Sequence, residues 1–314
     1  MEIVSSYPIN ESVLVEFREI LKDYDILISK RFIKDNEKEF LEDSNNQCRF
    51  CGKSHPEVLF KKVAHAIPEF IGNKCLISKF ECDTCNQLFS KFENEMANYM
   101  LPHNVMSGTR SKGNKTAKYK QAGQPQINYG DEYINISDVP ESMLNNVHNP
   151  TLQVKRPSYI PEFVYRCMIK IGMSIVPEEK LYMYSGTLGW LRNLDIQSNL
   201  KPGMVLTMYP FNLKSDEISC IILNRKDECV KNVPQSIFFL SYNNFAFQTF
   251  IPYTQNEKTG VALQVVPFVF PTSFDLNKDY DGQATYSYID LSSRSKLKNQ
   301  IVTYTITGEG YINE

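Results

Sequence analysis

The sequence has no strong excess of charge, because 34 Lys and Arg residues stand against 36 Asp and Glu residues, for a formal net charge of −2. A protein that binds nucleic acid over its whole surface is therefore excluded, whereas a local basic surface is not. Long apolar runs are also missing, and none approaches the ~18 residues that a membrane-spanning helix needs. The first residues lack the basic start and apolar core of a secretory signal. We therefore expect a cytoplasmic protein that does not contact a membrane.

Apolar residues, in contrast, are abundant. They make up 42% of the 314 residues and include 18 Tyr and 19 Phe. This composition is typical of a folded globular chain and excludes wholesale disorder. The length suggests about two domains, at ~150 residues for each.

Eight cysteines are present, and four of them form two C-x-x-C pairs, Cys48 with Cys51 and Cys82 with Cys85. Cytosolic thiols are kept reduced, so paired cysteines indicate a metal before a disulfide. Two such pairs supply the four thiolates of a tetrahedral Zn²⁺ site, and this closed shell leaves no position for a reactive water. We predict a structural zinc that holds together a segment with a small core. The alternative is that the four are reduced cysteines of an ordinary core.

A histidine, an Ile-Pro pair and a glycine lie between the cysteine pairs, and an asparagine directly follows the second pair. These residues are His65, Ile67, Pro68, Gly72 and Asn86. In this order the segment resembles the HNH nucleases, the zinc-stapled branch of the ββα-metal superfamily. The resemblance implies metal-dependent hydrolysis of a phosphodiester, with His65 as general base on water and Mg²⁺ or Mn²⁺ at the leaving 3′ oxygen. The products would carry 5′-phosphate and 3′-hydroxyl ends. A neutral imidazole near pH 7 suits this proton transfer.

The helix expected after the second cysteine pair carries Asn86, Ser90 and Glu93 on one face. The resemblance places Asn86 at a ligand position of the catalytic metal, and Glu93 is expected to complete the shell directly or through water. The alternatives are a helix cap for Asn86, an exposed helix position for Glu93 and a buried core position for His65. A second, apolar face is expected to pack against the preceding hairpin, and it consists of Phe89, Phe92 and Met96.

One residue departs from the family pattern. Ala64 stands directly before His65, where many family members have an acid or a histidine that ligates the metal. Three consequences stay open: Glu93 and water compensate for the missing ligand, the metal is held weakly, or cleavage has been lost. The family's middle asparagine, which orients the base, has its nearest counterpart by position in Asn73.

A basic stretch follows this segment, and no Asp or Glu occurs between Met96 and Gly130. Its cations alternate with Gly and Ser, which predicts a loop beside the active site that contacts phosphates without reading bases. The alternative is a solvated loop with incidental charge. The residues expected to bind substrate are Arg110, Lys112, Lys115 and Lys118.

We predict an α+β fold in three segments. Residues 1–47 are expected to be a helical N-terminal segment, with a helix over 9–43. Residues 48–125 are expected to form the HNH nuclease module with its basic loop. Residues 150–314 are expected to form an α+β accessory domain, β-rich after 203 and mostly antiparallel.

Within the accessory domain a helix is expected over 161–176, with Pro161 near its first turn. Asn243 and Asn244 suit a hairpin turn. Val, Ile, Phe, Tyr and Thr are concentrated in the expected strands. These strands are 204–209, 218–223, 236–242, 246–251, 262–270 and 301–306.

Three functions follow from this pattern. The first is a metal-dependent endonuclease acting on DNA, with RNA as a second candidate substrate and, by family association alone, a role in defence against foreign DNA. The second is a catalytically inactive, zinc-stapled module that binds nucleic acid or protein, for which Ala64 is the best argument. The third is a subunit of a larger assembly, with a protein partner bound through residues 200–314.

Overall fold

The computed structural model describes residues 3–8, 12–34, 37–110, 115–130, 133–139, 151–257, 270–275 and 282–305. The α-helices in these ranges are α1 (Ser12–Ile20), α2 (Asp83–Met106), α3 (Pro161–Ile175) and α4 (Ser185–Arg192). They accompany a seven-stranded antiparallel sheet and three small sheets, so the predicted α+β class with a mostly antiparallel C-terminal region is confirmed. No helix within the described ranges is long and apolar enough to cross a membrane.

The seven strands of the largest sheet follow the order β1-β14-β10-β13-β12-β11-β2. They are β1 (Ile3–Pro8), β2 (Tyr24–Ile33), β10 (Gly203–Met208), β11 (Glu217–Arg225), β12 (Ser236–Tyr242), β13 (Phe245–Phe250) and β14 (Gln283–Asp290). The strands predicted between 204 and 251 are confirmed as β10 to β13, whereas β14 was not predicted. Asn243 adopts a φ of 51°, the left-handed conformation that a tight hairpin needs, so the predicted turn is confirmed.

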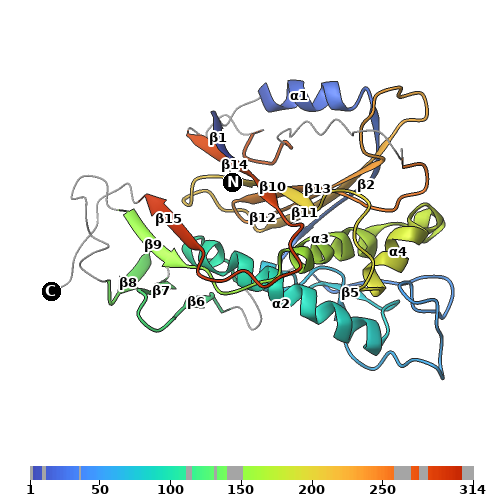
Figure 1. The fold of residues 1–314 in the computed structure, drawn as a ribbon, viewed down its shortest axis with the longest axis horizontal. Helices are drawn as coiled ribbons and strands as arrows, with labels where there is room; N and C mark the ends of the chain where they lie inside the picture. The colour runs from blue at the N-terminus through green and yellow to red at the C-terminus, as the bar shows by residue number, and fades with distance from the viewer. Residues whose placement is uncertain are drawn as a thin grey trace.

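The N-terminal segment supplies both edge strands of this sheet. β1 pairs with β14 and β2 pairs with β11, while α1 lies across one face between them (Figure 1). The helix predicted over 9–43 is therefore confirmed only within α1 and is wrong for β2 and for β3 (Glu39–Leu41). Pairing with a strand far along the chain overrides the local helical pattern.

Different helices cover the two faces of the large sheet (Figure 1). On one face, α1 packs Phe17 against a cluster that includes Phe239. On the other face lies α3, which is almost entirely buried. Gly172 of α3 allows this close approach, because an added Cβ would come within 3.3 Å of the Phe238 ring. The helix predicted over 161–176 is confirmed, and it forms the centre of the molecule.

A smaller sheet and α2 form a ββα unit beside α3. The sheet has the order β3-β5-β4, and its central hairpin consists of β4 (Ala64–His65) and β5 (Leu76–Ser78). The predicted apolar face of α2 is buried: Phe89 packs on Phe50, with ring centroids 4.7 Å apart. Phe92 packs on Phe163 of α3 at 5.0 Å. The helix thus packs on the segment of the first cysteine pair and on α3.

Two further small sheets lie at the C-terminal end of α2. One consists of β6 (Lys118–Tyr119), β7 (Gln126–Tyr129) and β8 (Ile134–Ser137), and the other of β9 (Thr151–Lys155) and β15 (Ile301–Thr305). Tyr119 packs in one cluster with Val105 and Met106 of α2. The strand predicted over 301–306 is thus confirmed as β15. The strand predicted over 262–270 lies outside the described residues, except for Phe270.

Candidate functional site

The two cysteine pairs meet at one point of the ββα unit. The sulfur atoms of Cys48, Cys51, Cys82 and Cys85 all lie within 4.8 Å of one another. Cys51 Sγ and Cys82 Sγ are 3.8 Å apart, and a tetrahedral site with Zn–S bonds of about 2.3 Å requires about 3.8 Å between sulfurs. Among the described residues, no other group of three or more His, Cys, Asp or Glu side chains could share an ion. The donor set and its spacing therefore fit a structural zinc.

The local backbone presents these sulfurs to one another. Gly52 follows the first pair with a φ of 69°, which allows the tight turn that returns its amide to the Cys48 carbonyl at 2.7 Å. Cys82 caps the N-terminus of α2, and its Sγ accepts from the Cys85 amide at 3.5 Å. The Cys82 amide in turn donates to Cys48 Sγ at 3.4 Å. Both pairs thus have the amide contacts that stabilise thiolates.

Because the sulfurs lie so close together, the pKa values of Cys48 and Cys85 shift in opposite directions. The pKa of Cys48 is lowered to about 5, because the Cys85 thiol and nearby backbone amides donate hydrogen bonds to its thiolate. The same contact raises the pKa of Cys85. One thiolate is therefore available below neutral pH, and a bound metal ion would displace the remaining protons.

His65 lies on β4, opposite Ile77 of β5. Its side chain is 20% exposed, and its Nε2 atom lies 4.0 Å from Oε1 of Glu69. An imidazole with this exposure can exchange a proton with a solvent-borne group, which a fully buried core histidine cannot. Glu69 was missed from the sequence, although it follows His65 by four residues across the Ile-Pro turn.

Asn73 holds the connection between β4 and β5 in place. It is fully buried. Its Nδ2 donates to the Ile67 carbonyl at 2.6 Å and to the Leu76 carbonyl at 3.1 Å. Its Oδ1 accepts from the amides of Cys75 and Leu76 at 3.2 and 2.9 Å. One side chain thereby satisfies four backbone groups and fixes the hairpin that carries His65.

Asn86 lies in the first turn of α2, facing the start of the hairpin. The cap of this helix is Cys82, so Asn86 is not needed for capping. Its Nδ2 donates to the carbonyl of Val63 at 3.4 Å, two residues before His65. The start of α2 and the strand that carries His65 are therefore neighbours.

A family model described as HNH endonuclease matches residues 48–101. This segment belongs to the HNH endonuclease family. It contains the four cysteines, His65, Asn73 and Asn86, and it ends within α2. No curated protein and no solved structure matches the chain. We refer to residues 48–101 as the HNH segment.

Lys170 of α3 reaches into the HNH segment. Its Nζ donates to the His65 carbonyl at 2.7 Å and lies 3.2 Å from Glu81 Oε2 and 3.5 Å from Glu93 Oε1. The Lys170 and Glu81 side chains are 1% and 0% exposed, and that of Glu93 is 26% exposed. Glu93, the predicted metal ligand, therefore pairs with the Lys170 ammonium, which also pairs with Glu81. The sequence did not reveal this contact.

Burial and ion pairing act in opposite directions on the pKa values of this cluster. Burial raises the pKa of Glu81 to about 7, against the opposing effect of Lys170. Burial alone would lower the pKa of Lys170, but the carboxylates of Glu81 and Glu93 outweigh it and raise that pKa. Lys170 therefore stays charged at neutral pH, while Glu81 can still take up a proton.

The predicted phosphate-binding residues follow α2 at several places in the fold. The backbone of Arg110 passes close to Gly72 in the β4–β5 connection, and Lys118 lies on β6 at the C-terminal end of α2. Val105 lies nineteen positions after Asn86 along α2. At a rise of about 1.5 Å per residue, these two helix positions are about 28 Å apart. Lys115 is exposed just before β6, and Lys112 lies outside the described residues.

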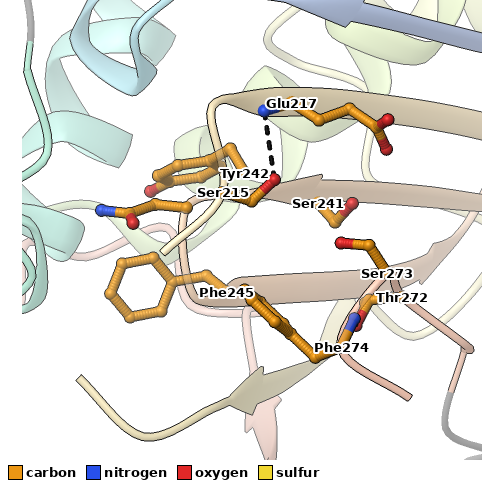
Figure 2. A pocket seen from close by; sticks show the side chains of 9 residues that line it. Ser215, Glu217, Ser241, Tyr242, Phe245, Thr272, Ser273 and Phe274 are labelled. Carbon is orange, nitrogen blue, oxygen red and sulfur yellow. Dashed lines mark hydrogen bonds between the residues drawn. The ribbon is translucent and has the colours of Figure 1, made fainter. Parts of the chain in front are cut away.

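A pocket lies on the large sheet (Figure 2). It lies at the β12–β13 turn, and Ser215 Oγ accepts from the Glu217 amide at its rim at 3.1 Å. Hydroxyl groups, aromatic rings and one carboxylate line it, and none of its lining residues is Lys or Arg. The pocket therefore has no cationic side chain to neutralise a phosphate.

Proposed function

We propose that this chain is a metal-dependent HNH endonuclease that hydrolyses phosphodiester bonds of DNA. The observation that supports this most is the placement of His65: one-fifth exposed, on a strand fixed by Asn73 and beside the first turn of α2. An inactive zinc module has no need of a histidine held in this way.

In the proposed reaction, the neutral imidazole of His65 takes a proton from the attacking water. Glu69, whose carboxylate lies 4.0 Å from Nε2, stabilises the imidazolium that forms. The Lys170 hydrogen bond to the His65 carbonyl holds the strand while the proton moves. A base positioned in this way contributes about 10²–10⁴-fold to a rate.

The proposed ligands of the catalytic metal are Asn86 and Glu93. Both supply oxygen donors of the kind that Mg²⁺ and Mn²⁺ prefer, but Glu93 shares its carboxylate with Lys170 and Ala64 supplies no ligand. Mg²⁺ usually keeps several waters and binds through one or two protein oxygens plus substrate phosphate, so this sparse set fits a weakly held ion. When bound, the metal would neutralise charge on the leaving oxygen.

The proposal extends to the basic residues after α2, to residues 150–314 and to the role of the protein in the cell. Arg110, Lys112, Lys115 and Lys118 would hold substrate phosphates distant from the cleaved bond, and residues 150–314 would form the accessory part that binds a protein partner. By family association, the enzyme would act in the cytoplasm against foreign DNA. A plaque assay on cells that express the wild-type chain or H65A tests the defensive role: only the wild type should reduce plaque numbers.

End-group analysis of the cleaved DNA tests the proposed chemistry. Zinc-loaded protein is incubated with supercoiled plasmid, with and without Mg²⁺ or Mn²⁺. Nicks that form only with added metal and carry 5′-phosphate and 3′-hydroxyl ends are expected. Nicks with 3′-phosphate ends, or nicks independent of added metal, would contradict the proposal.

The second candidate is a binding module without cleavage. The specific observation in its favour is Ala64, which stands where many family members carry a metal ligand. If zinc-loaded wild type binds DNA but leaves plasmid intact with every metal tried, this candidate replaces the first.

A further inference from the structure

A loop of residues 59–63 directly precedes the strand that carries His65. The sequence predicted phosphate contacts only after α2, yet this loop carries two lysines, Lys61 and Lys62, both exposed. The loop ends at Val63, directly before β4. Val63 also contacts Asn86, so the loop adjoins both the strand of His65 and the first turn of α2.

The backbone of this loop is fixed by the first turn of α2. The Asp83 carboxylate accepts from the amides of Lys61 and Lys62 at 3.0 and 2.9 Å. The Asp83 amide donates to the Leu59 carbonyl at 2.7 Å, and Asn86 donates to Val63. The lysine side chains therefore project from a rigid backbone that is anchored beside the zinc cysteines.

Exposed apolar side chains flank these lysines on both sides. Leu59 is 40% exposed, Phe60 37% and Val63 66%. Three large apolar residues on one ordered five-residue loop form a patch with no cover in the described structure. These side chains flank two adjacent cations, and a sugar–phosphate backbone presents both charged phosphates and apolar sugar faces.

We infer that the 59–63 loop is a nucleic-acid contact of the HNH segment. Lys61 and Lys62 bind backbone phosphates next to the cleaved bond, and Phe60 and Val63 contact the adjoining sugars. This inference rests on the proposed function for its substrate class, but it concerns binding and does not need cleavage.

The expected effect follows from counterion release. Each phosphate contact on duplex DNA contributes about 0.9 to the slope of log affinity against log salt. Removal of both lysines in K61A/K62A should lower that slope by about 1.8, which corresponds to about 30-fold weaker binding at 0.15 M salt and about fourfold at 0.5 M. Phe60→Ser should weaken binding and leave the salt slope unchanged.

The experiment measures binding of a labelled DNA duplex by zinc-loaded chains in the H65A background, so that cleavage cannot interfere. K22A/K231A is the matched control, because it removes two exposed lysines that pair with Glu19 and Asp23, near α1. Equal zinc content and thermal unfolding in all variants exclude misfolding.

Three outcomes are informative. Weaker binding and a shallower slope for K61A/K62A alone support the inference, even if the wild-type chain cleaves nothing and the proposed enzymatic function fails. Equal binding by K61A/K62A and the control overturns the inference while the nuclease proposal stands. A chain that binds no DNA at any salt concentration overturns it as well.

Discussion

Replacement of Lys170 by methionine removes one ammonium group and keeps most of the aliphatic side chain. In the folded chain that ammonium joins the His65 carbonyl to the carboxylates of Glu81 and Glu93. The change therefore leaves buried acceptors unpaired without opening a large cavity. It tests whether the contact between α3 and the HNH segment depends on this charge.

The magnitude follows from burial. Loss of one partner of a buried ion pair typically costs about 3–5 kcal/mol. Burial already holds the pKa of Glu81 near 7, so this carboxyl can take up a proton when Lys170 is lost. We therefore expect the lower value, about 3 kcal/mol at pH 6, and a larger loss at pH 8, where protonation is harder. At about 2–4 °C per kcal/mol, the melting temperature should fall by about 6–12 °C.

Urea and thermal unfolding of K170M at pH 6 and pH 8 measure this loss. Lys79→Met is the matched control, because Lys79 pairs with Glu42 at 2.6 Å in an ion pair whose side chains are both more than half exposed. Its loss should cost no more than about 1 kcal/mol. If K170M and K79M lose the same stability at both pH values, the buried cluster does not hold α3 to the HNH segment and the reasoning is refuted.

Three further changes are expected to have defined effects. Cys82→Ser should reduce bound zinc below one ion per chain and make residues 48–101 sensitive to protease; unchanged zinc content by mass spectrometry would contradict the four-cysteine site. Asn73→Ala removes four hydrogen bonds to buried backbone groups, and only the Leu76 carbonyl keeps a second donor, so urea unfolding should show a loss of at least about 2 kcal/mol. For Glu81, folding raises the pKa from 4.5 to about 7, so wild-type stability should fall as the pH rises through this range. In Glu81→Gln this fall should be smaller in unfolding curves measured at several pH values.

Local patterns in the sequence predicted much of the centre of the molecule. The cysteine spacing identified four sulfurs that the fold brings together. The burial of Phe89 and Phe92 followed from helical periodicity, and Pro161 marked the start of α3. Each of these features depends on residues close together in the chain or on one repeating pattern.

Features that depend on distant pairing were missed. The segment 24–33 has a mixed pattern and becomes a strand only because β11 pairs with it. Lys170 looked like an ordinary helix lysine, because its partners His65, Glu81 and Glu93 lie on other elements. The small sheet that carries Lys118 forms at the C-terminal end of α2, and this sheet is not visible in the charge pattern.

The most direct test of the central claim compares single-turnover plasmid nicking by wild type and H65A, with DNA affinity measured on the same zinc-loaded samples. We predict metal-dependent nicking that falls by at least about 10²-fold in H65A, while affinity and melting temperature stay unchanged. Nicking at equal rates by the two chains would contradict the role of His65 as the general base.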